Sequence, residues 1–532
     1  MMSELENNLI HRVNVGDSLT RSAARYPART AVVDGDRTFT YTEFNLWVNR
    51  VANGLLSRGY ARGDSLALAA GNSAEFLATY YACGKIGVVC VPINLGWRSP
   101  EIEHVLTHSS ARGIVIESQL IDAMRDAVEG AESVSDVVIA PGTQPEVGLG
   151  QGIEGRAVVS FADFVSDCED EPMVFVDDRD SLSYLYTSGT TSAPKGVMGS
   201  HTSIYLESLS MALEGRFDDT DEFLAIMPMF HTAQLNCHCT PALMVGAAIH
   251  IMRGFDADEL LSIIEHRGIT QLFALPMMFR QLLEHPRITG TDLSSLRRAL
   301  YAMAPMPQNQ LERCIEIFDC DFYLLFGQTE MSPTATLFRP EHQLSHNGAA
   351  GTPVANVQVA IMDESGTLLQ PGQSGEIVYR GPHTMSGYLD HPEATKAAFA
   401  HGWFHSGDIG HFDDDGLLWF TDRKKDVIKT GGENVASIEV EKAILEVDSS
   451  VAEVVVVGLP HAHWTEAITA FVVPMEGERI DPDALIASVK TVIDPYKAPK
   501  SVIIVEHLPK TSTGKIQKHL VRHEFEGHYA GE

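Results

Sequence analysis

The chain has 532 residues, which is long enough for more than one folding unit and a large buried core. Hydrophobic residues make up 44% and charged residues 21%, a composition that excludes intrinsic disorder as the main state. The 39 Lys and Arg against 71 Asp and Glu give a net charge of −32, which disfavours nucleic acid as a partner. A nucleotide site in such a chain needs local cations or backbone N–H groups.

The seven cysteines are odd in number and scattered, a pattern that favours a reducing compartment over a disulfide framework. Only Cys237-His238-Cys239 suggests a metal site. Because a second Cys or His pair does not accompany it, buried apolar thiols are the favoured interpretation over zinc. The chain starts with acidic residues, and no apolar run approaches the ~20 residues that span a bilayer. We therefore expect a cytoplasmic protein without an integral membrane segment.

Alternating apolar and amphipathic stretches begin at about residue 38. Strands at 65–70 and 88–92 flank a helix at 73–85, which is the βαβ pattern. After the polar stretch 141–156, the sequence predicts a strand ending near Tyr186, a helix at 201–213, and strands at 222–227 and 271–275. These elements predict an α/β fold whose large N-terminal domain contains two doubly wound sheets.

The pattern changes between about residues 350 and 420. Turn signals such as Asp363-Glu-Ser-Gly and Asp413-Asp-Asp-Gly separate short alternating strands there, as in a small β-barrel or meander. Beyond residue 422 the sequence predicts a small α+β domain, with helices at 437–446 and 482–493 and strands at 453–457, 469–473 and 501–505. We therefore expect an N-terminal domain of residues 1–421 and a C-terminal domain of residues 422–532.

The strongest motif is Tyr186-Thr-Ser-Gly-Thr-Thr-Ser-Ala-Pro-Lys-Gly196. Its hydroxyls, its backbone N–H groups and the Lys195 ammonium can surround a chain of phosphates. It is not a Walker loop, because Pro194 precedes the lysine and Gly196 follows it. The alternative is a solvated loop, but the apolar strand before the motif and its Pro-Lys-Gly ending favour phosphate binding.

This motif resembles the phosphate-binding signature of the adenylate-forming superfamily, which contains acyl-CoA synthetases, peptide-synthetase adenylation domains and luciferases. The resemblance extends over nearly the whole chain, because further segments agree in the same order. They are Phe326-Gly-Gln-Thr-Glu330, Trp403-Phe-His-Ser-Gly-Asp408, Asp422-Arg-Lys-Lys-Asp426, Thr430-Gly-Gly-Glu-Asn434 and Pro509-Lys-Thr-Ser-Thr-Gly-Lys515. The resemblance implies that the small C-terminal domain is mobile and rotates about the segment 422–425.

The resemblance also implies the residues that bind ATP and CoA. Asp408 would accept from the ribose hydroxyls, with Arg423 as a second ribose contact, and Gly431 and Gly432 would move toward the CoA arm. The other expected nucleotide contacts are Thr187, Ser188, Gly189, Thr190, Thr191, Lys195, Phe326, Gly327, Gln328 and Thr329.

Three side chains are expected to be catalytic: Lys515, Glu330 and His231. The carboxylate of Glu330 can hold Mg²⁺ against the triphosphate together with the hydroxyl of Thr187, although a helix N-terminal charge is its alternative role. In the family the lysine that matches Lys515 bridges the carboxylate substrate and the α-phosphate; by itself a C-terminal lysine is usually a solvated charge.

The chemistry requires these groups together. A carboxylate is a poor electrophile at pH 7, so attack on the α-phosphate of ATP makes an acyl-adenylate, from which a thiol displaces AMP. Both steps concentrate negative charge, which Lys195, Lys515, Arg423, Mg²⁺ and backbone donors would offset. The sequence thus predicts an AMP-forming acid–thiol ligase that uses ATP, Mg²⁺ and CoA.

The acid substrate is expected to be fatty or aryl. The segment Met227–Asn236 matches the family's acyl pocket, where His231 resembles the gate beside the carboxylate or is a core histidine. It carries no acidic residue to pair an ammonium, which argues against an amino acid. Ala302 and Met303 stand where many relatives have Gly-Gly, which alters the pocket, and the surrounding methionines suit a flexible apolar acyl group.

Two other functions stay open at this point. The acyl group could pass to a carrier-protein thiol or to a nitrogen nucleophile, since the ATP residues would be the same. A luciferase-like or non-catalytic homologue is the third possibility, which the complete set of motifs argues against. The intact Thr430-Gly-Gly-Glu-Asn segment favours CoA, and the acidic surface permits a monomer or a homodimer.

Overall fold

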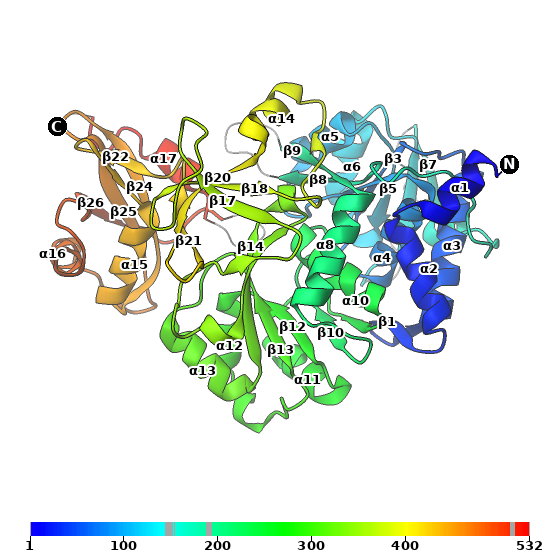
Figure 1. Ribbon diagram of the computed structural model, residues 1–532, viewed down its shortest axis with the longest axis horizontal. Coiled ribbons are helices and arrows are strands. Elements are labelled where there is room, and N and C mark those ends of the chain that lie inside the picture. The colour runs from blue at the N-terminus through cyan, green and yellow to red at the C-terminus, as the bar shows by residue number, and fades with distance from the viewer. Residues whose placement is uncertain (1, 144–152, 154, 188–193, 511–515, 531–532) are drawn as a thin grey trace. The chain divides into compact units, whose positions relative to one another are not determined.

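The computed structural model describes residues 2–143, 153, 155–187, 194–510 and 516–530 (Figure 1). The chain divides into two compact units. The first comprises Met1–Val359 with Tyr379–Phe404, and the second comprises Ala360–Val378 with His405–Glu532. Both α-helices and β-strands occur throughout, so the expected α/β class is confirmed. The domain boundary expected between residues 421 and 422 remains a proposal.

The first unit contains an eight-stranded sheet in the order β19-β9-β8-β4-β3-β5-β6-β7. Strands β3, β4, β5, β6 and β7 are parallel, whereas β9 is antiparallel to β8 and to β19. Its strands are β3 (Ser65–Ala69), β4 (Val89–Pro92), β5 (Ala111–Glu117), β6 (Asp136–Ala140), β7 (Ala157–Ser160), β8 (Ser181–Thr187), β9 (Lys195–Ser200) and β19 (Gly387–Tyr388).

The predicted βαβ unit is present in this sheet. Helix α4 (Ala74–Ile86) connects the parallel strands β3 and β4. The Ser73 side chain accepts from the backbone N–H of Phe76 at its start, and Gly87 ends it with φ 72°, a left-handed conformation that favours glycine. All its residues are buried, as expected for a helix enclosed by other elements.

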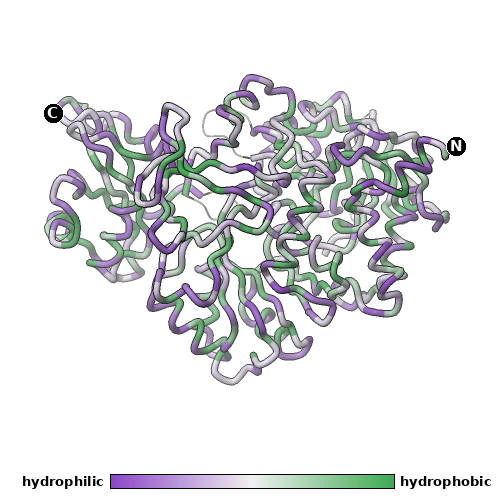
Figure 2. The backbone as a smooth tube through the Cα atoms, in the orientation of Figure 1, coloured by the Kyte–Doolittle hydropathy of each residue, from purple (hydrophilic) through white to green (hydrophobic). Residues whose placement is uncertain are grey.

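A nine-stranded sheet follows the order β16-β15-β14-β13-β12-β10-β11-β1-β2. Figure 1 shows helices α11 (Ala257–Arg267), α12 (Pro276–Glu284) and α13 (Gln308–Phe318) beside it, and Figure 2 shows hydrophobic stretches along its central strands. The strands are β1 (Thr30–Asp34), β2 (Arg37–Thr40), β10 (Glu222–Ala225), β11 (Ala248–Ile251), β12 (Gln271–Ala274), β13 (Arg298–Tyr301), β14 (Asp321–Gly327), β15 (Thr334–Phe338) and β16 (Thr352–Pro353). The two expected sheets are therefore confirmed.

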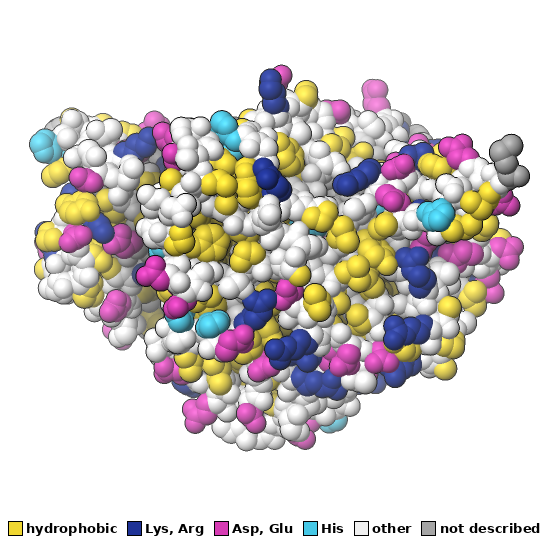
Figure 3. All heavy atoms as spheres, viewed as in Figure 1, with side chains coloured by type: hydrophobic (Ala, Val, Ile, Leu, Met, Phe, Trp, Pro, Cys, Tyr) yellow, Lys and Arg dark blue, Asp and Glu magenta, His cyan; other side chains and the backbone are white. Residues whose placement is uncertain are grey.

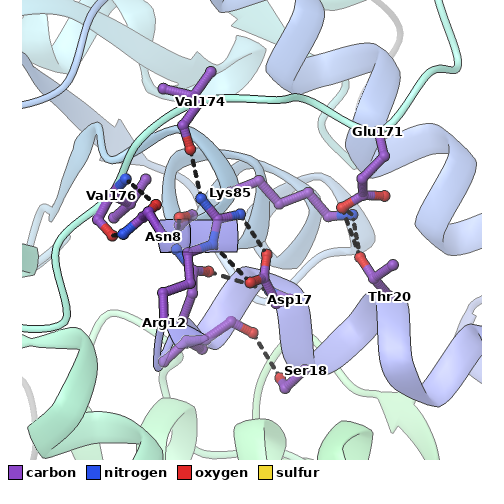
Figure 4. A network of polar contacts seen from close by, with 12 residues as sticks. Asn8, Arg12, Asp17, Ser18, Thr20, Lys85, Glu171, Val174 and Val176 are labelled. Atoms are coloured by element: carbon purple, nitrogen blue, oxygen red, sulfur yellow. Dashed lines mark hydrogen bonds and ion pairs between the residues drawn. The ribbon is translucent and has the colours of Figure 1, made fainter. Parts of the chain in front are cut away.

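The buried side chain of Lys85 connects several helices of the first unit through hydrogen bonds (Figure 4). The Nζ of Lys85 on α4 donates to Thr20 Oγ1 at 2.6 Å, Asn45 Oδ1 at 2.9 Å and Asn49 Oδ1 at 2.7 Å, and lies 2.6 Å from Glu171 Oε1. Burial lowers the pKa of Lys85, whereas the charge of Glu171 opposes that shift. The acceptors offset the desolvation of the ammonium and join α2 (Val15–Arg25), α3 (Tyr41–Ser57) and α4 to the chain that leads into β8.

The same stretch of chain is held at further points. Asn8 on α1 (Glu4–His11) donates to Val176 O at 2.8 Å, and Arg12 forms an ion pair with Asp17 at 2.8 Å while donating to Val174 O at 2.5 Å (Figure 4). These bonds satisfy carbonyl groups of a segment that has no regular secondary structure. The N-terminal helices thus fix the approach to β8.

The second unit contains most of a four-stranded sheet and all of a five-stranded one. The four-stranded sheet, in the order of β17 (Gln358–Met362), β18 (Gly375–Arg380), β20 (Phe404–Phe412) and β21 (Leu418–Arg423), is the expected meander. The Asp363 carboxylate accepts from the backbone N–H groups of Ser365 and Thr367 at 2.9 Å each, which closes the turn after β17.

The C-terminal sheet has its core in β24 (Val451–His461) and β25 (Thr465–Pro474). Both strands are longer than the expected 453–457 and 469–473, because they form one continuous antiparallel hairpin whose pairing extends past the β-branched runs. The remaining elements are β22 (Ile428–Thr430), β23 (Glu433–Val435), β26 (Ser501–Ile504), α15 (Ser437–Val447), α16 (Pro482–Val492) and α17 (Lys518–Glu524).

Figure 3 shows Lys and Arg side chains beside Asp and Glu side chains on the face in view, so local cations exist despite the net charge of −32. Within the residues that the structure describes, no helix combines the length and apolarity needed to cross a membrane.

Candidate active site

The β8–β9 hairpin brings together the two ends of the predicted phosphate loop. Thr187, the last residue of β8, pairs with Lys195, the first residue of β9, and Tyr186 pairs with Gly196. The hydroxyl of Thr187 and the stem of Lys195 therefore start from neighbouring positions on one sheet edge. The expected contacts Ser188, Gly189, Thr190 and Thr191 lie outside the described residues, as does Lys515.

The turn after β14 carries the second group of expected contacts. A Cβ added to Gly327 would lie 2.0 Å from the carbonyl oxygen of Pro333, so only glycine fits there. The backbone N–H of Gln328 donates to that same oxygen at 2.9 Å. This close turn follows Phe326 at the end of β14 and leads into the short 3-10 helix η4 (Thr329–Met331). Glu330 lies in this helix.

Glu330 is half-buried and held from two sides. Its backbone carbonyl accepts from Met385 N at 2.7 Å, and its Oε1 accepts from the hydroxyl of Tyr388 at 2.9 Å. The Nζ of Lys195 lies 5.4 Å from the centroid of the Tyr388 ring. Tyr388 thus contacts two predicted ATP-binding side chains, Lys195 and Glu330, and it is a residue that the motif analysis missed because nothing in its own segment indicates where its side chain points.

Asp408 and Arg423 form an ion pair in the second unit. They are directly opposite each other on β20 and β21, and Arg423 Nε lies 2.7 Å from Asp408 Oδ1. Asp408 is buried, at 2% exposure, and its backbone N–H donates to Ser406 Oγ at 3.0 Å. Arg423 lines a small cavity together with Gly407, Lys424 and Lys425. The structure pairs the two residues with each other, which the motifs did not predict, and their expected contacts to a ribose remain a prediction.

The glycines of the Thr430-Gly-Gly-Glu segment form a tight turn between β22 and β23. Gly431 has φ 59° and Gly432 has φ 91°, both left-handed conformations that non-glycine residues rarely adopt. Thr430 pairs with Glu433 across this two-residue loop, as in a type I′ hairpin. The turn alone therefore requires both glycines, and their part in CoA binding stays a prediction.

The segment 422–426 is bonded both to the four-stranded sheet and to the C-terminal helices, since Asp422 Oδ2 accepts from Ser437 N on α15 at 2.5 Å. Lys424 N donates to Gly407 O at 2.9 Å, and Lys424 Nζ lies 3.1 Å from Glu376, so this residue is tied to the four-stranded sheet. Asp426 forms an ion pair at 2.8 Å with Arg522 on α17. Lys425 stands between these two attachments.

His231 precedes α9 (Thr232–Gln234), and its backbone N–H donates to Pro228 O at 3.1 Å. The preceding strand end is fixed by Gln234, whose Oε1 accepts from Met227 N at 3.0 Å. The imidazole is half-buried, a position compatible with either of its expected roles. Its role as a gate remains a prediction.

Cys237 and Cys239 belong to a π-helical turn, Leu235–Cys239, and are buried free thiols. The Cys237 thiol donates to Ala233 O at 2.8 Å, and burial raises the pKa of Cys239 to about 12. Their expected character as buried thiols is confirmed. In the described ranges, no cluster of three or more His, Cys, Asp or Glu is arranged to hold a metal ion.

Met303 occupies an unusual backbone conformation just beyond β13. Its φ is 76°, in the left-handed region, and its side chain is 52% exposed. The family's glycine at this place would adopt that conformation without strain. The departure noted in the sequence therefore coincides with a strained backbone position, and its place beside the acyl group remains a prediction.

The antiparallel strands β8 and β9, the glycine turn before Glu330 and the Asp408–Arg423 strand pair are each compatible with the class of adenylate-forming enzymes. Two family models match the chain: "AMP-binding enzyme" over residues 19–389 and "AMP-binding enzyme C-terminal domain" over residues 439–515. The chain belongs to the AMP-binding enzyme family, as its motifs predicted.

Relatives match over almost the full length. A feruloyl-CoA synthase from Amycolatopsis is 35% identical over 96% of this chain and 99% of its own. A long-chain-fatty-acid–CoA ligase from Mycobacterium tuberculosis is 33% identical over 96% and 98%. The crystal structure of ATP-bound MatB from Rhodopseudomonas palustris superimposes with a TM-score of 0.86 and 27% identity over 98% of this chain and 100% of that one. These relatives agree with the predicted enzyme class, an AMP-forming acyl-CoA synthetase.

Proposed function

We propose that the protein activates a fatty or aryl carboxylic acid with ATP and transfers the acyl group to CoA. The products are acyl-CoA, AMP and pyrophosphate. The observation that carries the proposal is the set Lys195, Tyr388 and Glu330, which joins a cation from the phosphate hairpin to a carboxylate from the β14 turn.

In the first half-reaction, a carboxylate oxygen of the acid attacks the α-phosphorus of ATP. The bond between that phosphorus and the bridging oxygen breaks, and pyrophosphate leaves with both bonding electrons. Lys195 at the head of β9 offsets the charge of the phosphate chain, and Lys515 stabilises the charge on the α-phosphate. Asp408 holds the ribose hydroxyls, with Arg423 fixing its carboxylate.

The residues present fit a magnesium ion. Glu330 offers a half-buried carboxylate and Thr187 a hydroxyl, which are the oxygen ligands that this hard cation prefers beside phosphate oxygens. When bound, Mg²⁺ would supply positive charge to the leaving pyrophosphate. Glu330 and Thr187 are the residues we assign to hold it.

In the second half-reaction, the CoA thiol loses its proton to water and its sulfur attacks the acyl carbon, and AMP leaves with the electrons of the broken carbon–oxygen bond. The Gly431-Gly432 turn approaches the CoA arm after rotation of the C-terminal domain, residues 422–532. We assign the rotation to Lys425, because its neighbours Lys424 and Asp426 are bonded to different elements.

The acid class rests on the segment that matches the acyl pocket. Residues 227–236 contain no carboxylate that could pair an α-ammonium. The relatives named for feruloyl and long-chain fatty acyl groups support aryl and fatty acids as the two classes to test. We further propose a cytoplasmic enzyme, monomeric or homodimeric, whose partners are the acid, ATP and CoA.

The deciding experiment measures pyrophosphate release with ATP and Mg²⁺ over a panel of fatty, aryl and amino acids, each with and without CoA. We expect release with one fatty or aryl class and formation of its CoA thioester. Release with no thioester would reject CoA as the acceptor in favour of a carrier-protein thiol or a nitrogen nucleophile. Preference for an α-amino acid would contradict the substrate class.

A further inference from the structure

Tyr388 is placed by backbone contacts on both of its sides. Strand β19 pairs with β9, with Tyr388 opposite Val197, and the next residue, Leu389, donates its N–H to Gly196 O at 2.9 Å. The Tyr388 N–H donates to Thr395 Oγ1 on α14 (Pro392–Ala398) at 2.9 Å. The strand is therefore held between the phosphate hairpin and a helix, which fixes the direction of its aromatic side chain.

The side chain of Tyr388 contacts two groups of opposite charge, one through its ring and one through its hydroxyl. The Lys195 ammonium lies 5.4 Å from the ring centroid, within the range of a cation–π contact. The hydroxyl donates to Glu330 Oε1 at 2.9 Å. Burial and the charge of Glu330 raise the pKa of Tyr388, so the hydroxyl keeps its proton and stays a donor at neutral pH.

This arrangement links the two large sheets. Lys195 belongs to β9 of the eight-stranded sheet, whereas Glu330 follows β14 of the nine-stranded sheet. A carboxylate has two oxygens, so a bond to Oε1 orients the group while the second oxygen can serve as a metal ligand. The ring thus sets the spacing between a phosphate-binding cation and the proposed magnesium ligand.

We propose that Tyr388 is a positioning residue of the ATP site, which orients Glu330 for the metal through its hydroxyl and Lys195 for the phosphates through its ring. The inference rests on the proposed function, since it assigns Tyr388 to the same site. The contribution of the hydroxyl and that of the ring can be removed by different substitutions. Tyr388→Phe deletes the hydroxyl and keeps the ring, whereas Tyr388→Leu deletes both.

The test measures binding without turnover. The probe is α,β-methylene-ATP, in which the bond that the enzyme would break is blocked, together with Mn²⁺, whose free concentration is followed by electron paramagnetic resonance. We expect Tyr388→Phe to weaken Mn²⁺ binding in the complex by roughly fivefold, the factor of one ordinary hydrogen bond. Binding of the nucleotide alone, in EDTA, should be unchanged in this variant. Tyr388→Leu should weaken both.

The matched control is Tyr60→Phe. Tyr60 also donates its hydroxyl to a carboxylate, Asp136 Oδ2 at 3.2 Å, and lies between α3 and β3, outside the proposed site. This variant should bind Mn²⁺ and nucleotide as the wild type does. The folded state of each variant is checked by its thermal unfolding curve.

If the Tyr388→Phe variant folds and binds Mn²⁺ with the affinity of the wild type, the inference is overturned. If Tyr388→Phe does not fold, Thr395→Val replaces it, because it removes the acceptor of the Tyr388 N–H and keeps the phenol; unchanged Mn²⁺ affinity there would overturn the inference equally. Failure of the proposed function looks different: the wild type itself would not bind α,β-methylene-ATP.

Discussion

Arg423 Nε lies 2.7 Å from Asp408 Oδ1, across the paired strands β20 and β21. The carboxylate is 3% exposed and the guanidinium 32% exposed, so the acid is the partner that depends on the pair. A buried carboxylate without a counter-charge is strongly destabilising. The pair therefore contributes to the stability of the second unit as well as to the proposed ribose site.

Removing the arginine should cost more stability than removing both charges. We expect Arg423→Ala to lower the free energy of unfolding by roughly 2 to 3 kcal/mol, because the buried Asp408 carboxylate loses the guanidinium with which it forms an ion pair. The double variant Arg423→Ala with Asp408→Asn should recover part of that loss. Urea unfolding of the two variants measures the difference, and equal losses would contradict the dependence of Asp408 on Arg423.

Lys515 should matter for one half-reaction. We expect Lys515→Ala to slow acyl-AMP formation by about a hundredfold or more, as for loss of one preorganised donor. Thioester formation from supplied acyl-AMP should survive. Single-turnover assays of each half-reaction give the two rates. The control is Lys510→Ala, which removes a nearby lysine that pairs with Glu453 and should leave both rates intact; equal slowing of both steps by Lys515→Ala would refute the assignment.

Met303→Gly should be nearly neutral for stability while it changes the acid preference. Glycine relieves the left-handed backbone at φ 76°, which offsets its larger entropy in the unfolded chain to within about 1 kcal/mol. The smaller side chain should raise kcat/KM for bulkier acids relative to smaller ones. Met277→Gly is the control, because Met277 is similarly exposed, at 46%, but lies in α12, where glycine should cost about 1 kcal/mol. An unaltered acid profile would place Met303 away from the pocket.

His201 should make the protein sensitive to acid. It is fully buried at the start of α8 (His201–Glu214), its Nδ1 accepts from Val15 N at 3.2 Å, and burial lowers its pKa from 6.5 to about 4. Below pH 6.5 this histidine binds a proton in the unfolded chain but stays neutral in the folded protein. The free energy of unfolding therefore falls as the pH drops from 6.5 toward 4, by up to about 3 kcal/mol.

The variant His201→Gln removes this titration. Its free energy of unfolding should change less than that of the wild type between pH 6.5 and 4.5, as measured by urea unfolding at several pH values. Parallel pH profiles of the two proteins would exclude His201 as a source of the acid sensitivity.

Lys425→Pro should separate the two half-reactions. Proline fixes φ near −65°, so a residue that absorbs a large dihedral change could no longer do so. We expect one half-reaction to stay within a few-fold of the wild-type rate and the other to slow by at least about tenfold. Lys424→Ala, which removes only the contact with Glu376, is the control. Equal effects of Lys425→Pro on both rates would argue against rotation at this residue.

Local signals in the sequence were sufficient for much of the fold. The Ser73 cap and Gly87 delimit α4, and the Asp363 turn closes as expected, because capping and turn formation depend on residues a few positions apart. The lengths of β24 and β25 were underestimated, since strand ends are decided by pairing with a distant partner. The order of the sheet strands likewise needed the structure.

The site shows the same division. The motifs selected Lys195, Glu330, Asp408 and Arg423 as candidates through their residue types and their resemblance to the adenylate-forming superfamily, and their roles in ATP binding remain predictions. Only the tertiary structure placed Tyr388 between Lys195 and Glu330, which lie 5.4 Å from its ring centroid and 2.9 Å from its hydroxyl. A contact between segments of two different sheets leaves no periodicity or local pattern in the chain, since it arises from the packing of the sheets themselves. The sequence by itself determined the chemistry available to this protein, and the packing decided which groups hold one another in place.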